Sequence, residues 1–209
     1  MKVLSDKLEF PPLDEASKEG LLAIGGDLSP ERLMLAYKTG IFPWYSHEQP
    51  ILWWSPDPRF VLFPGKLKIS KSLKQVLRNN RFKVTKNKAF NRVIKECSEA
   101  IRPNQPGTWI TNEMNQAYIE LHKLGFALSV EVWENDNLVG GLYGVDLGNN
   151  IFCGESMFSK VSNASKVGFV NFIQNSDYHL IDCQVFTEHL ERFGAEEMPR
   201  AEFIKLISG

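Results

Sequence analysis

Long apolar runs are missing from this sequence. No segment reaches the roughly 18 consecutive apolar residues of a transmembrane helix, and the opening stretch MKVLSDKLEF lacks the apolar core of a secretory signal. Cysteine is also scarce. Cys97, Cys153 and Cys183 form no CxxC pair, which argues against a disulfide framework and a structural zinc site. These features predict a cytoplasmic protein without membrane contact or bound metal.

Acidic residues are absent from one long segment. No aspartate or glutamate occurs between Asp57 and Glu96, whereas 12 of the 24 lysines and arginines lie there. The net charge of −1 therefore conceals a basic segment, because the rest of the chain has 12 basic against 25 acidic residues. Such a concentration of charge suits the phosphates of a nucleic acid. A merely solvated basic face is the alternative.

The N-terminal region is rich in proline, glycine and tryptophan over residues 11–64, which predicts mostly loops. One helix is expected after Ser29, whose side chain can cap it, with Pro30 at the first helical position. Gly40 can adopt the left-handed conformation that ends it. We therefore expect a small, loop-rich N-terminal domain over residues 1–64.

Apolar periodicity predicts further helices over about residues 71–79, 88–101 and 111–125. The first of these is amphipathic, with Leu73, Val76 and Leu77 on one side. Its opposite side is basic and carries Lys71, Lys74 and Arg78.

The pattern changes to strand alternation from residue 126 onward. A hairpin is expected first, and then a strand, a helix and a strand, over 126–132, 138–146, 151–158, 164–175 and 180–186. Two short helices near 188–193 and 200–207 end the chain. Residues 65–209 should thus form an α+β domain with a mixed sheet.

The last predicted strand carries two polar residues, Asp182 and Gln184, which regular alternation places on one face. The carboxylate can accept a proton or polarise Gln184, and the amide oxygen can orient an attacking amine, as an aminolysis reaction requires. The alternative is a polar strand face that meets solvent or caps a helix.

Glu155 interrupts an otherwise apolar strand beside Gly154, where a ligand can approach the backbone closely. It is a candidate ligand for a ribose or an amine, and an edge-strand glutamate facing water is the alternative. Ser156 lacks the second glycine of a G-x-S-x-G elbow. No cysteine–histidine pair stands out, and Gly25-Gly26-Asp27 matches neither a P-loop nor a dinucleotide fingerprint, so no cofactor is expected.

Aromatic side chains supply possible stacking surfaces. Tryptophans can stack on a base or enclose an apolar group, although most tryptophans are core residues. The candidates are Trp44, Trp53, Trp54 and Trp109. Core positions are likewise the first expectation for Phe152, Met157, Phe169 and Phe172.

Several long motifs follow one another in a distinctive order. The N-terminal motifs are Gly20–Pro30, Gly40–Trp44 and Ile51–Arg59. The later motifs are Gly107–Thr111, Glu131–Trp133, Leu138–Val145, Phe152–Ser159, Asn163–Lys166 and Leu180–Val185. Together they cover essentially the whole chain and closely resemble the bacterial leucyl/phenylalanyl-tRNA-protein transferases.

The resemblance implies an enzyme that takes leucine or phenylalanine from aminoacyl-tRNA and joins it to the N-terminal arginine or lysine of an acceptor protein. The product would be marked for degradation, and no metal or redox cofactor is implied. A C-terminal domain of the GNAT acyltransferase type is also implied. The R/Q-x-x-G-x-G/A pyrophosphate loop is missing, so acetyl-CoA is a poor donor candidate.

The resemblance also implies roles for individual residues. Asp182 and Gln184 match the catalytic pair, and Glu155 matches the residue that holds the terminal adenosine and aminoacyl group. Trp44 and Trp109 match tryptophans of the donor site. The apolar pocket for the donor side chain corresponds to Leu142, Phe152, Met157, Phe169 and Phe172. The basic helix that meets the tRNA backbone corresponds to Lys71, Lys74 and Arg78.

Two other functions stay open on the residues alone. One is a related tRNA-dependent transferase that recognises acidic N-termini. The other is a noncatalytic RNA-binding module built from the basic segment and exposed aromatics, which would bind charged and uncharged tRNA alike.

Overall fold

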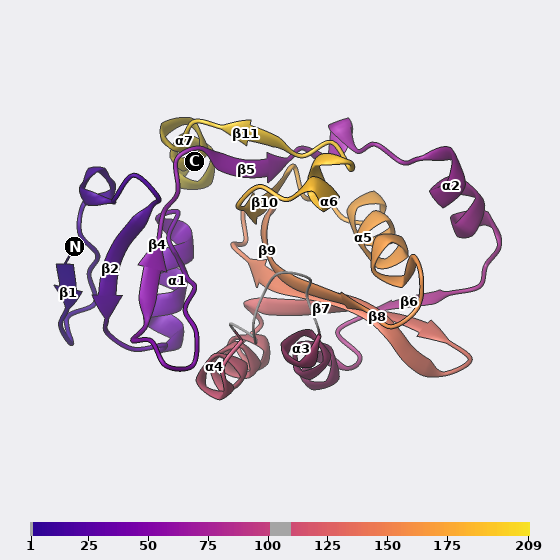
Figure 1. The fold of residues 1–209 in the computed structure, drawn as a ribbon, viewed down its shortest axis with the longest axis horizontal. Helices are drawn as coiled ribbons and strands as arrows, with labels where there is room; N and C mark the ends of the chain where they lie inside the picture. The colour runs from indigo at the N-terminus through magenta and orange to yellow at the C-terminus, as the bar shows by residue number, and fades with distance from the viewer. Residues whose placement is uncertain (1, 101–109) are drawn as a thin grey trace.

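Two β-sheets organise the part of the chain that the structure describes (Figure 1). The computed structural model describes residues 2–100 and 110–209. A four-stranded sheet forms the N-terminal part, and a seven-stranded sheet forms the remainder. The two stand side by side, and the chain passes from one to the other between β4 and β5.

The smaller sheet has the order β1-β2-β4-β3, formed by Lys2–Leu4, Leu21–Gly25, Leu52–Trp54 and Phe42–Pro43. Beside it lies α1 (Pro30–Lys38), which Ser29 caps by accepting the N–H of Arg32. Gly40 follows the helix with a φ of 77°. A Cβ at this position would meet the terminal methyl of Ile204, which can move aside, so the left-handed turn is the feature that favours glycine here.

The larger sheet has the order β11-β5-β10-β9-β8-β7-β6. In that order the strands are Glu196–Met198, Arg59–Leu62, Leu180–Gln184, Ile151–Ser159, Asn137–Asp146, Ala127–Glu134 and Lys83–Lys86. Among the described strands of this sheet, β9 and β10 are the only neighbours that pair in parallel, and the crossover helix α5 (Ala164–Gln174) joins them. Their pairing ends at Cys153 and Asp182, whereas β9 stays paired with β8 as far as Ser159. The sheet therefore opens between β9 and β10.

Helices cover both faces of the larger sheet (Figure 1). One face packs against α3 (Phe90–Glu99) and α4 (Asn112–Lys123), and the core there continues into the N-terminal sheet. The other face packs against α5, with α2 (Lys71–Arg78) contacting that helix. Two short helices, α6 (Glu188–Glu191) and α7 (Arg200–Ser208), flank β11. Short 3-10 turns occur at Leu13–Glu15 and Pro64–Lys66.

The α+β class with a mixed sheet is confirmed, as are the predicted helices and the central strands within a few residues. The loops predicted for the N-terminal region include four strands that form a sheet, β1 to β4, and β5, β6 and β11 of the larger sheet were not expected either. Each of these strands has only two to five residues, too few to show a clear alternation. β5 lies before residue 64 yet pairs within the larger sheet. We therefore propose that the N-terminal domain ends between β4 and β5.

Candidate active site

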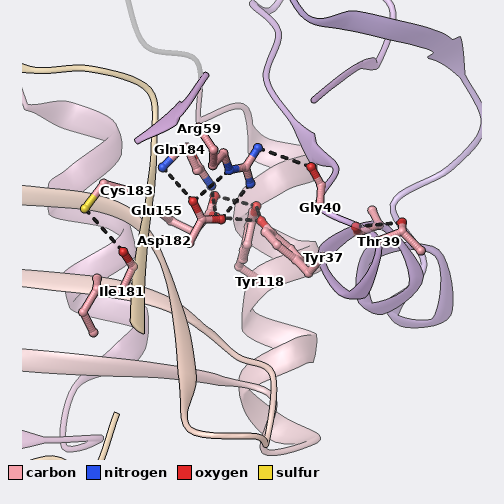
Figure 2. Close-up of polar contacts among 11 residues, drawn as sticks. Tyr37, Thr39, Gly40, Arg59, Tyr118, Glu155, Ile181, Asp182, Cys183 and Gln184 are labelled. Atoms are coloured by element: carbon pink, nitrogen blue, oxygen red, sulfur yellow. Dashed lines mark hydrogen bonds and ion pairs between the residues drawn. The ribbon is translucent and has the colours of Figure 1, made fainter. Parts of the chain in front are cut away.

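A β-bulge removes Glu155 from the regular alternation of β9. On β8, Tyr143 pairs with Ser156 and Gly144 pairs with Gly154, so Glu155 is the extra residue between them. Bulges of this kind redirect a side chain and are frequent beside active sites. Here the bulge brings Glu155 into a network of polar side chains (Figure 2).

The Glu155 carboxylate accepts hydrogen bonds from three separate parts of the fold (Figure 2). The Tyr37 hydroxyl of α1 donates to Oε1 at 2.7 Å, and the Tyr118 hydroxyl of α4 donates to Oε2 at 2.8 Å. The side-chain amide Nε2 of Gln184 donates to Oε1 at 2.7 Å. The two tyrosine oxygens also lie within hydrogen-bonding distance of each other, and because each hydroxyl has one proton, this contact is a hydrogen bond only when one tyrosine does not donate to Glu155. The N-terminal domain, α4 and β10 thus meet at one carboxylate.

Burial sets the ionisation of this network. It raises the pKa of Glu155 from 4.5 to about 7, although the hydrogen bonds from Tyr37, Tyr118 and Gln184 act in the opposite direction. Burial and the neighbouring carboxylate also raise the pKa of each tyrosine well above its ordinary value. The tyrosines therefore stay protonated as donors, whereas Glu155 changes charge near neutral pH.

Asp182 is fully buried in a two-pronged ion pair with Arg59 of β5. The Arg59 Nε lies 2.8 Å from Oδ1 and Nη2 lies 2.7 Å from Oδ2. The guanidinium also lies over the rings of Phe42 and Phe203, and its Nη1 donates to the Gly40 carbonyl at 3.3 Å. Both carboxylate oxygens are thus already engaged by a cation, which makes Asp182 a fixed anchor.

The chain leaves regular strand geometry at Gln184. The register with β5 shifts between Asp182 and Gln184, so Cys183 is a second bulge, and the predicted alternation through this strand fails there. Gln184 has a φ of 64°, which is uncommon for a residue other than glycine. Its backbone N–H donates to Asp182 Oδ1 at 2.9 Å. The anchored carboxylate therefore holds the turn that directs Gln184 toward Glu155.

A cavity of about 330 Å³ adjoins the network. Glu155, Asp182 and Gln184 are among the residues that line it. Its apolar walls include Leu142, Phe152, Met157, Phe169 and Ile181. Trp44 also lines it, is 40% exposed and packs on Trp54 with ring centroids 5.8 Å apart. The cavity offers an apolar group a binding place next to a carboxylate and an amide.

Phe172 is not among the lining residues of this cavity. It packs behind the wall, with its ring centroid 4.7 Å from that of Phe152, and borders a separate hollow beside α5. Trp109, predicted for the donor site, lies outside the described residues. The structure therefore groups four of the five predicted pocket residues around the cavity, together with Trp44.

The basic residues divide into two groups. Exposed side chains on α2 belong to Lys71, Lys74 and Arg78, while Leu73 of the same helix is buried. Ser70 caps this helix by accepting the Leu73 N–H. Arg59 belongs to the same acid-free segment but is buried, so counting it toward a phosphate-binding surface was wrong.

Sequence reasoning missed Tyr37, Tyr118 and the pairing of Arg59. Nothing in the local pattern distinguishes either tyrosine from an ordinary helical core residue. Cys153 and Cys183 are buried, and burial raises the pKa of both thiols, which opposes a nucleophilic role. Within residues 2–100 and 110–209 no group of three potential metal ligands occurs, and no helix is both long and apolar enough to cross a membrane.

Comparisons with known proteins agree on a class. The profile described as "Leucyl/phenylalanyl-tRNA protein transferase" matches residues 61–208, and that of its N-terminal domain matches residues 26–57. The fold and site are therefore those of an aminoacyltransferase that uses charged tRNA. The chain belongs to the leucyl/phenylalanyl-tRNA–protein transferase family.

Individual relatives carry the same name. The Flavobacterium johnsoniae protein is 57% identical over 210 residues, which cover 99% of each chain. The protein from Anaeromyxobacter sp. strain Fw109-5 is 56% identical over 204 residues, covering 96% of this chain and 86% of the relative. Among solved structures, a GCN5-related N-acetyltransferase from Kribbella flavida aligns with a TM-score of 0.37 and 11% identity, covering 82% and 61% of the two chains.

Proposed function

We propose that this transferase takes leucine or phenylalanine from its tRNA and joins it to the N-terminal arginine or lysine of acceptor proteins, creating a degradation signal. The observation that carries the proposal is the hydrogen-bonded pair of Glu155 and Gln184 at one end of an apolar cavity. The donor is a charged tRNA, so we infer that the enzyme works in the cytoplasm. The donor side chain would fill the cavity while its ester carbonyl lies near the polar pair.

The reaction is an aminolysis. The neutral α-amine of the acceptor attacks the ester carbonyl carbon, the new C–N bond forms, and the C–O bond to the tRNA ribose breaks. One amine proton leaves with the ribose oxygen. Gln184 already donates through Nε2 to Glu155, which leaves its amide oxygen to orient the incoming amine.

Glu155 and Asp182 then have different tasks. Glu155, with a pKa of about 7, can hold the amine or the ribose hydroxyl near neutral pH. Asp182 is engaged by Arg59 and by the Gln184 N–H, so it acts through the position of Gln184. This assignment replaces the role of proton acceptor that the sequence first suggested for Asp182.

Binding of the tRNA itself is assigned to α2. Its exposed Lys71, Lys74 and Arg78 would contact backbone phosphates, which position the tRNA without reading its bases. Lys83 and Lys86 are exposed on β6, the edge strand that follows α2 in the chain, and would extend the same surface.

The test is transfer of labelled leucine or phenylalanine from tRNA to a set of peptides that differ only in the first residue. We expect product with N-terminal lysine or arginine and none with N-terminal aspartate or glycine. Transfer to acidic N-termini would assign a different acceptor class. Binding of charged and uncharged tRNA without any transfer would indicate a noncatalytic module.

A further inference from the structure

An apolar surface borders the mouth of the active-site cavity directly after Gln184. Val185 lines the cavity and is 36% exposed, and the next residue, Phe186, is 51% exposed. The Val185 N–H donates to the Cys183 carbonyl at 2.8 Å, a tight turn that leads the chain away from β10. Phe186 then packs edge-on against Phe60 of β5, with ring centroids 5.3 Å apart. Val185 thus lies at the cavity, while Phe186, which does not line it, lies on the adjoining surface beside Phe60.

The surroundings of this surface are acidic. Between Val185 and Met198 the chain has four glutamates and one arginine. Glu188 and Glu191 of α6, which begins two residues after Phe186, are exposed. Glu188 also forms an ion pair with Arg192 at 3.2 Å, and because both side chains are exposed, solvent screens this pair. The neighbouring Thr187 also lines the cavity. This charge is opposite to that of α2, where tRNA phosphates are expected.

We propose that Val185, Phe186, Glu188 and Glu191 form an acceptor rim, which receives the first residues of the acceptor polypeptide. The proposal rests on the proposed function and deepens it, because nothing above assigns a place to the acceptor. The acceptor's amine must reach Gln184, and its chain must then leave the cavity across the adjoining surface. The rim is continuous with the cavity at Val185.

Two kinds of contact distinguish the rim from a site for the tRNA terminus. An apolar second residue of the acceptor would cover Phe186 and remove its exposed ring from water. The glutamates would attract the cationic first residue and repel phosphates. A peptide with a basic first residue and an apolar second residue therefore matches both the apolar and the acidic parts of the rim.

The test measures transfer of phenylalanine from tRNA to three acceptors: a peptide beginning Arg-Leu, the same peptide beginning Arg-Gly, and arginine amide. For the Phe186→Ser variant we expect the KM for the Arg-Leu peptide to rise about fivefold, toward that of the Arg-Gly peptide. Phe186→Leu should restore most of the difference between the two peptides. The KM for the charged tRNA should change little in either variant.

Leu124→Ser is the matched control, because Leu124 is 52% exposed at the end of α4 and does not line the cavity. It should leave all three acceptor KM values as they are. The double variant Glu188→Gln/Glu191→Gln gives an independent measurement, since it should weaken the salt dependence of the acceptor KM. This second variant decides the question if Phe186→Ser does not fold.

Several results would overturn the rim. An increased KM for the charged tRNA in Phe186→Ser would place the tRNA terminus there instead. An equal rise of the KM for all three acceptors in Phe186→Ser would also reject the proposed rim. Unchanged salt dependence of the acceptor KM in Glu188→Gln/Glu191→Gln would reject it as well. Failure of the wild-type enzyme to transfer phenylalanine to any of the three acceptors would reject the proposed function itself, whereas transfer that is insensitive to the rim variants would reject the rim alone.

Discussion

The buried pair of Arg59 and Asp182 allows stability and catalysis to be separated. Removing one partner of such a pair leaves an uncompensated buried charge, so Arg59→Met should lower the free energy of unfolding by about 3–5 kcal/mol. The side chains of Arg59 and Asp182 are 1% and 0% exposed, so this estimate for buried ion pairs applies to them. Replacing both partners by neutral groups should recover most of this loss, because no unpaired charge then remains.

Two double variants distinguish the possible roles of Asp182. In Arg59→Met/Asp182→Asn the new amide oxygen can still accept the Gln184 N–H, which donates to Oδ1 at 2.9 Å in the wild type. In Arg59→Met/Asp182→Leu that acceptor is gone. If Asp182 acts by holding Gln184, the asparagine double should keep substantial turnover. In the double variant with leucine, turnover should fall roughly 100-fold, which is the loss expected when a catalytic group is displaced by about 1 Å.

The assays are urea denaturation for stability and single-turnover transfer of phenylalanine from tRNA for chemistry. Comparison at saturating tRNA and acceptor removes effects on binding. Equal and severe loss of turnover in both doubles, with both stably folded, would refute the reasoning. The charge of Asp182 would then take part in the reaction directly.

Three further predictions concern the other parts of the site. Glu155 binds its proton more tightly in the folded state, with a pKa of about 7 against 4.5, so its contribution to stability is complete below pH 4.5 and is lost as pH rises through 7. Glu155→Gln should flatten that dependence in urea titrations, and a persistent slope would implicate another group. Met157→Ala should change the ratio of leucine to phenylalanine transfer while retaining the melting temperature, whereas Phe172→Ala should lower stability without changing donor choice. A shift in donor choice with Phe172→Ala would mean that the cavity is wrongly assigned. In the triple alanine variant of Lys71, Lys74 and Arg78, the slope of log tRNA affinity against log salt concentration should decrease by the equivalent of about three phosphate contacts. An unchanged slope would exclude α2 from the interface.

The helices, the four central strands and three polar residues of the site could be predicted from the amino-acid sequence. Apolar periodicity marked the helices, because one face of each is buried against a sheet. The acid-free segment marked the exposed basic helix, and the motifs around Glu155, Asp182 and Gln184 identified three of the polar residues that line the cavity. These signals are local, since each lies within a short stretch of chain.

The contacts between those residues could be known only from the tertiary structure. Tyr37 and Glu155 are 118 positions apart in the chain, and Arg59 and Asp182 are 123 apart, so no local pattern links them. The two bulges depend on register between neighbouring strands, and they redirect Glu155 and Gln184 against the alternation expected from sequence. Phe172 does not line the cavity for a similar reason. Helical spacing determines which side chains of α5 face the core, but it does not determine which of them line the cavity and which pack behind the lining residues.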